Sequence, residues 1–173
     1  LLHALHYLAN GSISALVTCA NTGAAVAAAS IYLGRFISLK HPALAATISL
    51  PAGKVVVLDI GAFVTAQASD LVSYARVGAS LASLQNISSP RVGIFNIGKE
   101  QRKGTATLHK ANMLLQEKKS FFSYIGFVEP IDVFSGALYP LWVVIIYIME
   151  PSRIPTTLNF TPSISGVLDS EKN

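Results

Sequence analysis

The stretch "RVGIFNIGKEQRKGT", Arg91 to Thr105, has three parts that follow one another as strand, loop and helix start. The run RVGIF is short and apolar, which favours a buried strand, and the charged loop after it contains two glycines. Thr105 is a good helix-capping residue, and the segment from Thr105 to Glu117 has a helical pattern. A strand, a loop and a helix in this order form the basic unit of α/β proteins.

The same alternation continues on both sides of this stretch. Further strand-like runs are Ser14 to Thr18, Ala43 to Leu50, Lys54 to Asp59, Phe121 to Val128 and Trp142 to Ile148, and further helices are expected at Thr22 to Leu33 and at Ser69 to Leu84. Ser69 and Asp70 are expected to begin the second of these helices. Only PAGK, Pro51 to Lys54, separates two of the strands, which predicts an antiparallel hairpin. The sequence therefore predicts an α/β fold with a mainly parallel sheet.

Length and composition limit the possibilities further. With 173 residues, 51% of them hydrophobic and 13% charged, the chain has the size of one domain. Its most apolar window, Leu138 to Met149, is shorter than the roughly 20 residues of a membrane span, so it predicts a buried strand or an interfacial patch. The amino terminus lacks a basic start and a cleavage site, which favours a cytoplasmic location. The segment 151–173 is rich in Pro, Ser and Thr, and we expect it to be loose.

Several site classes are poorly supported by the sequence. The net charge of +4 is scattered, which argues against nucleic-acid binding. Cys19 is the single cysteine, so we expect a packed thiol and no metal cluster. The four histidines have no nucleophile context, and His3 and His6 are expected on one face of a helix. Pro130 lies between Glu129 and Asp132, which favours a turn over a catalytic carboxylate pair.

Polar residues follow three of the expected strands, where α/β sheets bind their ligands. Asn21, Thr22 and Gly23 follow the first strand, Asp59 and Gly61 follow the third, and Asn96 follows RVGIF. Each residue also has a structural interpretation: a helix cap for Asn21 or Thr22, a turn former for Asp59 and a strand terminator for Asn96. Their shared position at strand ends favours a binding site.

The loop after RVGIF resembles a phosphate-binding loop but is not a Walker motif. That motif places its lysine after the second glycine, whereas Lys103 precedes Gly104 here, and no G-x-G-x-x-G motif occurs in the chain. A phosphate interpretation therefore depends on Lys99, Arg102, Lys103 and the free N–H groups near Thr105. The alternative is a solvated charged turn.

Taken in order, the loops resemble the bacterial phosphate acyltransferase (PlsX) family of phospholipid synthesis. That family carries SAGNTGA, RPAL, LLDVGAN, PRVGLLNIGEEETKG and FIGNVEGRDIF. The corresponding segments here are TCANTGA (Thr18 to Ala24), HPAL (His41 to Leu44), VLDIGAF (Val57 to Phe63), PRVGIFNIGKEQRKG (Pro90 to Gly104) and YIGFVEPIDVF (Tyr124 to Phe134). The resemblance covers roughly residues 1–136.

The resemblance implies a Rossmann-like, isopropylmalate-dehydrogenase-like three-layer α/β fold with helices on both faces. It also implies a homodimer that transfers a fatty acyl group from acyl carrier protein to inorganic phosphate without metal or cofactor, with peripheral membrane association in full-length members. By position, Lys103 would be the catalytic or phosphate-holding cation. The remaining predicted substrate-binding and phosphate-binding residues are Asn21, Thr22, Gly23, Asp59, Gly61, Asn96, Gly98 and Gly104.

The chain also departs from the family pattern. Ala20, Phe63 and Phe127 replace a glycine and two asparagines, and the family's D-A-M-G-G-D and DGF-x-GN motifs are missing. We therefore expect a partial acyltransferase domain over residues 1–137, a divergent apolar strand or patch at 138–150 and a loose tail at 151–173. Two alternatives remain: a catalytically impaired remnant of the enzyme, and a short-chain phosphate acetyltransferase or butyryltransferase.

Overall fold

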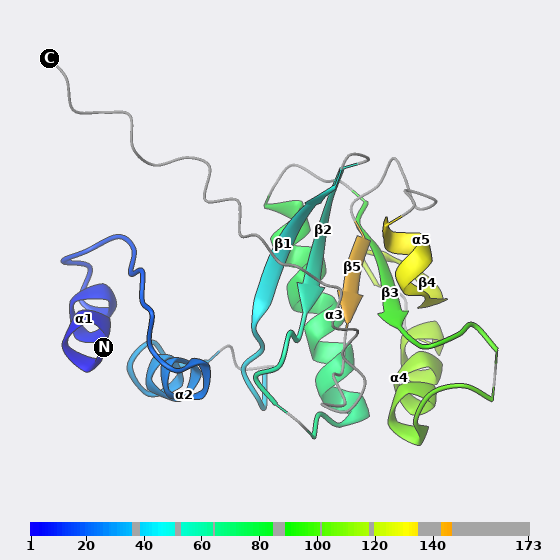
Figure 1. Ribbon diagram of the computed structural model, residues 1–173, viewed down its shortest axis with the longest axis horizontal. Coiled ribbons are helices and arrows are strands. Elements are labelled where there is room, and N and C mark those ends of the chain that lie inside the picture. The colour runs from blue at the N-terminus through cyan, green and yellow to red at the C-terminus, as the bar shows by residue number, and fades with distance from the viewer. Residues whose placement is uncertain are drawn as a thin grey trace, which may run out of the picture.

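The computed structural model describes residues 1–35, 39–50, 53–63, 65–84, 89–100, 102–117, 120–134 and 143–146 (Figure 1). Helices and strands follow one another as α1 (Leu2–Ala9), α2 (Thr22–Tyr32), β1 (Ala45–Leu50), β2 (Gly53–Leu58), α3 (Ala68–Ser83), β3 (Arg91–Phe95), α4 (Ala106–Glu117), β4 (Ser123–Val128), α5 (Pro130–Phe134) and β5 (Val143–Ile146). This is the α/β alternation that the sequence predicts.

The five strands of the described residues form one sheet in the order β1-β2-β5-β3-β4 (Figure 1). β1 and β2 pair antiparallel from Ala45↔Leu58 to Leu50↔Gly53, which confirms the predicted hairpin. The other three strand pairs are parallel, which confirms the mainly parallel sheet. β5 is the last of the described strands in sequence but lies between β2 and β3, so the apolar run that contains it supplies a central strand.

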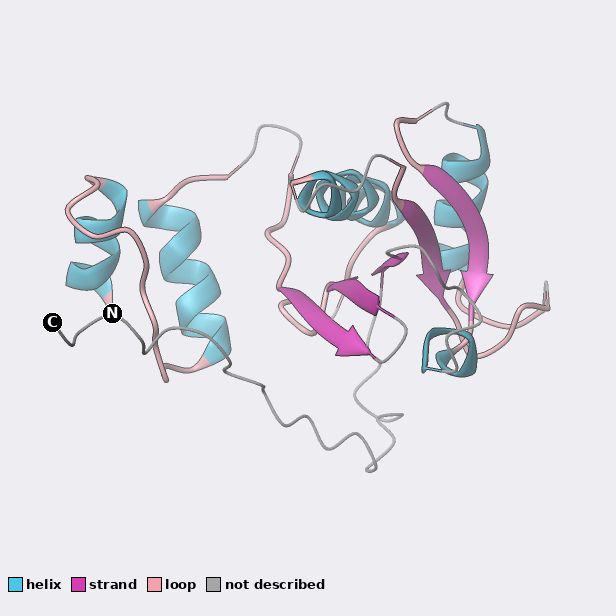
Figure 2. Ribbon diagram, turned by 90° about the horizontal axis from the view of Figure 1, so that it is seen from above, coloured by secondary structure: helices cyan, strands magenta, loops and turns pink. Residues whose placement is uncertain are grey.

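Helices cover both faces of the sheet. Val56 and Leu58 of β2 and Val92 and Ile94 of β3 are buried against α3 and α4 on one face. Alternate residues of the strands point to the other face, where Val55 and Val128 pack with Val133 of α5. Figure 2 shows α3 and α5 on opposite sides of the strands. The three-layer arrangement agrees with the predicted Rossmann-like architecture.

Local sequence explains where α3 begins and which face it buries. Gln67 and Asp70 form a capping box, in which the Asp70 carboxylate accepts a 2.8 Å hydrogen bond from the Gln67 backbone N–H. The predicted start at Ser69 is therefore one residue late, because the helix begins at Ala68 and Asp70 acts from its third position. Buried residues then recur every three or four positions and form one apolar stripe: Leu71, Ala75, Ala79 and Ala82.

The prediction of a strand at Ser14 to Thr18 is wrong. This segment has no regular secondary structure in the chain's described part, and the Val17 side chain is 94% exposed. β-branched residues favour a strand only where a neighbouring strand supplies hydrogen bonds, and here none is adjacent. Cys19 of the following turn is exposed, so the expectation of a packed thiol is also wrong.

The first two helices lie apart from the sheet. α1, which contains His3 and His6 as expected, packs against α2, and both helices lie to one side of the sheet in Figures 1 and 2. Two further predictions fall mostly or wholly outside the described residues, namely the patch 138–150, of which 143–146 is described, and the tail 151–173. Among the described helices, none has both the length and the apolarity of a membrane span.

Candidate functional site

The carboxyl ends of the parallel strands carry most of the predicted site residues. The loop from Asp59 follows β2, the loop from Asn96 to Thr105 follows β3, and Glu129 follows β4. Because these strands run parallel, the three loops lie at the same edge of the sheet. The structure therefore brings Asp59 and Gly61 to the edge that also carries Asn96, Gly98, Lys103 and Gly104.

Asn96 closes the loop after β3. Its side chain is 4% exposed; Oδ1 accepts a 2.9 Å hydrogen bond from the Ile97 N–H, and Nδ2 donates a 2.9 Å hydrogen bond to the Lys103 carbonyl oxygen. The Asn96 backbone N–H also donates to the carbonyl oxygen of Val128 in β4. Asn96 therefore does more than end the strand, because its amide ties the two ends of the loop together.

Gly104 is required next to this amide. It has φ of +100°, and a Cβ atom at this position would lie 2.7 Å from Asn96 Oδ1 and 2.9 Å from Asn96 Nδ2. A larger residue would meet both unfavourable backbone geometry and a side chain that is already buried. Asn96 and Gly104 therefore act as one structural unit.

Lys99 is held by groups at the start of α5. Its Nζ lies 2.8 Å from Asp132 Oδ1, and its backbone N–H donates a 3.2 Å hydrogen bond to Glu129 Oε1. The hydrogen bond from Lys99 and the Glu129 backbone N–H lower the pKa of Asp132, and the same bond from Asp132 raises the pKa of Lys99. The turn predicted at Glu129 to Asp132 is instead the start of the short helix α5, which Pro130 begins. Both carboxylates anchor the charged loop.

Lys103 has a local and exposed partner. Its Nζ lies 2.9 Å from Glu100 Oε1, with the side chains 47% and 62% exposed. This hydrogen bond raises the pKa of Lys103 and lowers the pKa of Glu100. Arg102 is exposed and has no ion-pair partner among the described residues. The loop therefore presents the cationic groups of Arg102 and Lys103 to solvent.

Asp59 organises the neighbouring turn. The carboxylate is 3% exposed and accepts hydrogen bonds from four backbone N–H groups. Oδ1 accepts those of Leu44, Gly61 and Ala62, at 3.0, 3.3 and 2.9 Å, and Oδ2 accepts that of Phe63 at 3.0 Å. Gly61 has φ of +116° in this turn. The geometry agrees with the turn-forming interpretation of Asp59.

The structure does not bring Asn21, Thr22 and Gly23 to this edge. Asn21 is the N-cap of α2, where its Oδ1 accepts a 3.2 Å hydrogen bond from the Ala24 N–H. All three residues are exposed, and no described strand precedes them. The helix-capping interpretation of Asn21 is therefore confirmed, whereas the expected strand-to-helix turn at these residues is wrong.

A groove of about 740 Å³ lies between the N-termini of α3 and α4. Its polar lining residues are Thr65, Gln67, Ser69, Thr105, Thr107 and Lys110, and Leu114 supplies an apolar wall. The groove continues directly from the loop after β3, because Thr105 is both the end of that loop and the N-cap that accepts the Leu108 N–H at 3.3 Å. Helix N-termini attract negative charge, so this groove favours an anionic or strongly polar ligand.

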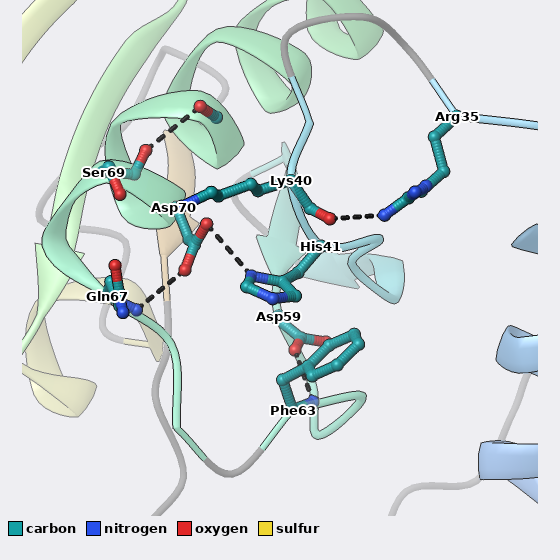
Figure 3. A network of polar contacts seen from close by, with 9 residues as sticks. Arg35, Lys40, His41, Asp59, Phe63, Gln67, Ser69 and Asp70 are labelled. Carbon is teal, nitrogen blue, oxygen red and sulfur yellow. Dashed lines mark hydrogen bonds and ion pairs between the residues drawn. The ribbon is translucent and has the colours of Figure 1, made fainter.

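Sequence reasoning missed a second polar network beside the groove (Figure 3). His41 Nδ1 lies 3.2 Å from Asp70 Oδ1, and the His41 ring lies 5.0 Å from the Phe63 ring. The nearby Tyr74 hydroxyl is buried without a hydrogen-bond partner among the described residues. Its pKa is raised by burial and then by the charges of Asp59 and Asp70. The three-residue spacing from Gln67 to Asp70 is typical of a capping box, and it is the sequence signal that could have placed Asp70 in this network.

Comparisons with known proteins identify the family of this chain. The family model of the fatty acid synthesis protein matches residues 1–146. Phosphate acyltransferase from Petrotoga mobilis is 37% identical over 128 residues, which are 73% of this chain and 39% of that protein. The enzyme from Ruegeria pomeroyi is 39% identical over 134 residues, which are 75% of this chain and 36% of that protein.

A solved structure shows a related fold. The branched-chain phosphotransacylase from Enterococcus faecalis superposes with a TM-score of 0.54 and 11% identity, over 84% of this chain and 58% of that chain. The chain spans 39% of the length of the Petrotoga mobilis enzyme and 36% of the length of the Ruegeria pomeroyi enzyme. Together with the ordered sequence motifs, the match over residues 1–146 shows that the chain belongs to the fatty acid synthesis protein family, whose relatives named above are phosphate acyltransferases.

Proposed function

We propose that this protein transfers a fatty acyl group from acyl carrier protein to inorganic phosphate. A phosphate oxygen attacks the carbonyl carbon of the thioester, the carbon–oxygen bond forms, and the carbon–sulfur bond breaks. The proton of the hydrogen phosphate ends on the departing sulfur, so the products are an acyl phosphate and the free thiol of the carrier protein. Phosphate is already a nucleophile near neutral pH, so the enzyme mainly has to position it and stabilise developing charge.

The observation that carries the proposal is the loop between Asn96 and Thr105. Family membership supports acyl transfer to phosphate, and this loop supports a place for the phosphate. The loop lies at the carboxyl end of β3, its backbone is fixed by Asn96, and the cations of Arg102 and Lys103 are exposed on it. In this proposal Lys103 binds the phosphate and stabilises the oxyanion.

The groove between α3 and α4 is the proposed place for the thioester arm of the carrier protein. Its hydroxyl and amide groups suit the polar arm, and Leu114 suits the beginning of the acyl chain. The homodimer that the family resemblance implies forms part of the same proposal, as does a cytoplasmic location.

The proposal is tested by incubating the purified protein with palmitoyl-acyl carrier protein and inorganic phosphate. Acyl phosphate should form, trapped as a hydroxamate, and the carrier-protein thiol should appear in equal amount. Parallel reactions with acetyl-coenzyme A and butyryl-coenzyme A test the short-chain alternative, which a clear preference for these donors would favour. Formation of free fatty acid without acyl phosphate would contradict transfer to phosphate.

One observation favours a second candidate, a member of the family with impaired catalysis. Asn21, Thr22 and Gly23, which the sequence resemblance assigns to the phosphate pocket, lie on the helix pair beside the sheet and are exposed. A pocket that uses only the loop after β3 would hold phosphate with fewer groups. In the same assay this candidate predicts phosphate binding with no detectable acyl transfer.

A further inference from the structure

Glu100 occupies the position where an anion would meet Lys103. Its Oε1 lies 2.9 Å from Lys103 Nζ, which is a normal distance for a charge-assisted hydrogen bond. The two side chains fold together over Gly98, which is buried beneath them. A Cβ atom on Gly98 would collide with Glu100 Oε2 and with the Lys103 side chain, and would lie 2.8 Å from Lys103 Nζ.

The other ion pair of the loop is built differently. Lys99 binds Asp132, whose side chain is only 15% exposed and also accepts the Glu129 backbone N–H at 2.9 Å. Asp132 is therefore held by α5 and fixes the loop. Glu100 is less firmly held: its side chain is 62% exposed, its backbone support is its own N–H, and Lys103 is its one described side-chain partner. An exposed pair of this kind contributes little to stability, so a competing anion can separate it.

We propose that Glu100 sets the phosphate specificity of the site, because its carboxylate occupies the anion position at Lys103 and Gly98 and phosphate must displace it. This inference rests on the proposed function and adds a residue to it. A hydrogen phosphate dianion carries more charge and more acceptor oxygens than a carboxylate, so it replaces Glu100 at Lys103. Singly charged anions replace it poorly, and Glu100 therefore selects against them.

The test compares Glu100→Gln and Glu100→Ala with the native protein. Glu117→Gln is the matched control, because Glu117 is exposed at the end of α4 and its replacement changes the net charge by the same amount. The first readout is the KM for inorganic phosphate at saturating palmitoyl-acyl carrier protein. The second is independent of activity: labelling of Lys103 by an amine reagent, followed by peptide mass spectrometry, across a series of inorganic phosphate concentrations and, separately, of acetate concentrations.

Both Glu100 variants should lower the phosphate KM by about two- to fivefold, the range expected for an exposed ion pair, and leave kcat close to the native value. The phosphate concentration that half protects Lys103 should fall by the same factor, and acetate should begin to protect. Glu117→Gln should match the native protein. A purely structural role of Glu100 would leave protection unchanged or weaken it.

The inference is overturned if the phosphate KM and the phosphate concentration that half protects Lys103 are as high in the Glu100 variants as in the native protein, or higher. It is also overturned if phosphate protects Lys103 in none of the proteins. The two readouts separate this inference from the proposed function. If the protection shifts as expected but no protein forms acyl phosphate, acyl transfer is wrong and the role of Glu100 at the anion site stands.

Discussion

Asn96 Nδ2 donates a 2.9 Å hydrogen bond to the backbone carbonyl oxygen of Lys103, seven residues further along the chain. The amide is buried at the end of β3, whereas the Lys103 amine is exposed. The rigid end of β3 therefore fixes the backbone of Lys103, the residue that we propose binds phosphate, while the Lys103 side chain remains free to exchange partners. Positioning by a buried amide suits a reaction in which the enzyme mainly has to orient an anion.

Replacing Asn96 by alanine should destabilise the fold and loosen the loop. The variant loses the hydrogen bonds to the Ile97 N–H and the Lys103 carbonyl and leaves both groups without this partner. The free energy of unfolding should fall by about 1–3 kcal/mol, measured by urea denaturation. Asn10→Ala, at an exposed asparagine after α1, is the control and should cost clearly less. Equal losses in the two variants would contradict a special role for Asn96.

Alanine at Gly104 should cost more than alanine at Gly61. Both glycines have positive φ, +100° and +116°, so each substitution strains the backbone by about 1–3 kcal/mol. Only at Gly104 does the added Cβ atom meet a side chain, the Asn96 amide at 2.7 Å. Urea denaturation of the two variants should therefore show an additional loss at Gly104 of about 1–3 kcal/mol. If the Gly61 variant loses as much, the close approach of Gly104 to Asn96 is wrong.

Removing the Tyr74 hydroxyl should not harm stability. The hydroxyl is buried without a partner among the described residues, and burial followed by the charges of Asp59 and Asp70 raises its pKa. Phenylalanine keeps the ring and removes a polar group that already lost its water on folding. The Tyr74→Phe variant should match the native free energy of unfolding within about 1 kcal/mol, or exceed it. A larger loss in thermal or urea denaturation would show that the hydroxyl has a partner.

Asp132 should make stability depend on pH in the acidic range. Lys99 and the Glu129 N–H lower the pKa of Asp132 in the folded protein. A lowered folded-state pKa stabilises the fold above the unfolded value of about 4, and this contribution disappears as the pH falls through the folded-state pKa. The Asp132→Asn variant should therefore be less stable than the native protein near neutral pH, and the difference should shrink in acid. A difference that stays constant with pH would exclude this role.

Much of the fold could be predicted because it depends on local signals. The runs Lys54 to Asp59 and Arg91 to Asn96 end in polar residues, and the short PAGK connection permits only a hairpin, so strands and pairing direction followed from the sequence. The position of β5 between β2 and β3 could not, because strand order depends on contacts distant in sequence. The strand predicted at Ser14 to Thr18 is wrong for the same reason, because a β-branched run does not itself determine whether a neighbouring strand is available to pair with it.

Individual site residues were harder to predict than the location of the site. The sequence places Asp59 and Asn96 at strand ends, but whether their polar atoms face a ligand or the chain's own backbone depends on loop geometry. Both turn toward the backbone, Asp59 to four N–H groups and Asn96 to Ile97 and Lys103. The pair between Glu100 and Lys103 was within reach of the sequence, because their three-residue separation is typical of local ion pairs.

Transfer of labelled phosphate with and without Lys103 directly tests whether the loop after β3 holds the attacking phosphate. Native protein and the Lys103→Gln variant are incubated with palmitoyl-acyl carrier protein and phosphate labelled with oxygen-18, and the acyl phosphate is analysed by mass spectrometry. Lys40→Gln is the control, because Lys40 is exposed, lies outside this loop and loses the same charge on replacement. We expect oxygen-18 in the acyl phosphate of the native protein and the control, and at least about a hundredfold less product with Lys103→Gln, as for loss of an oxyanion-stabilising group. Labelled acyl phosphate formed at the native rate by Lys103→Gln would show that the loop after β3 does not hold the attacking phosphate through Lys103.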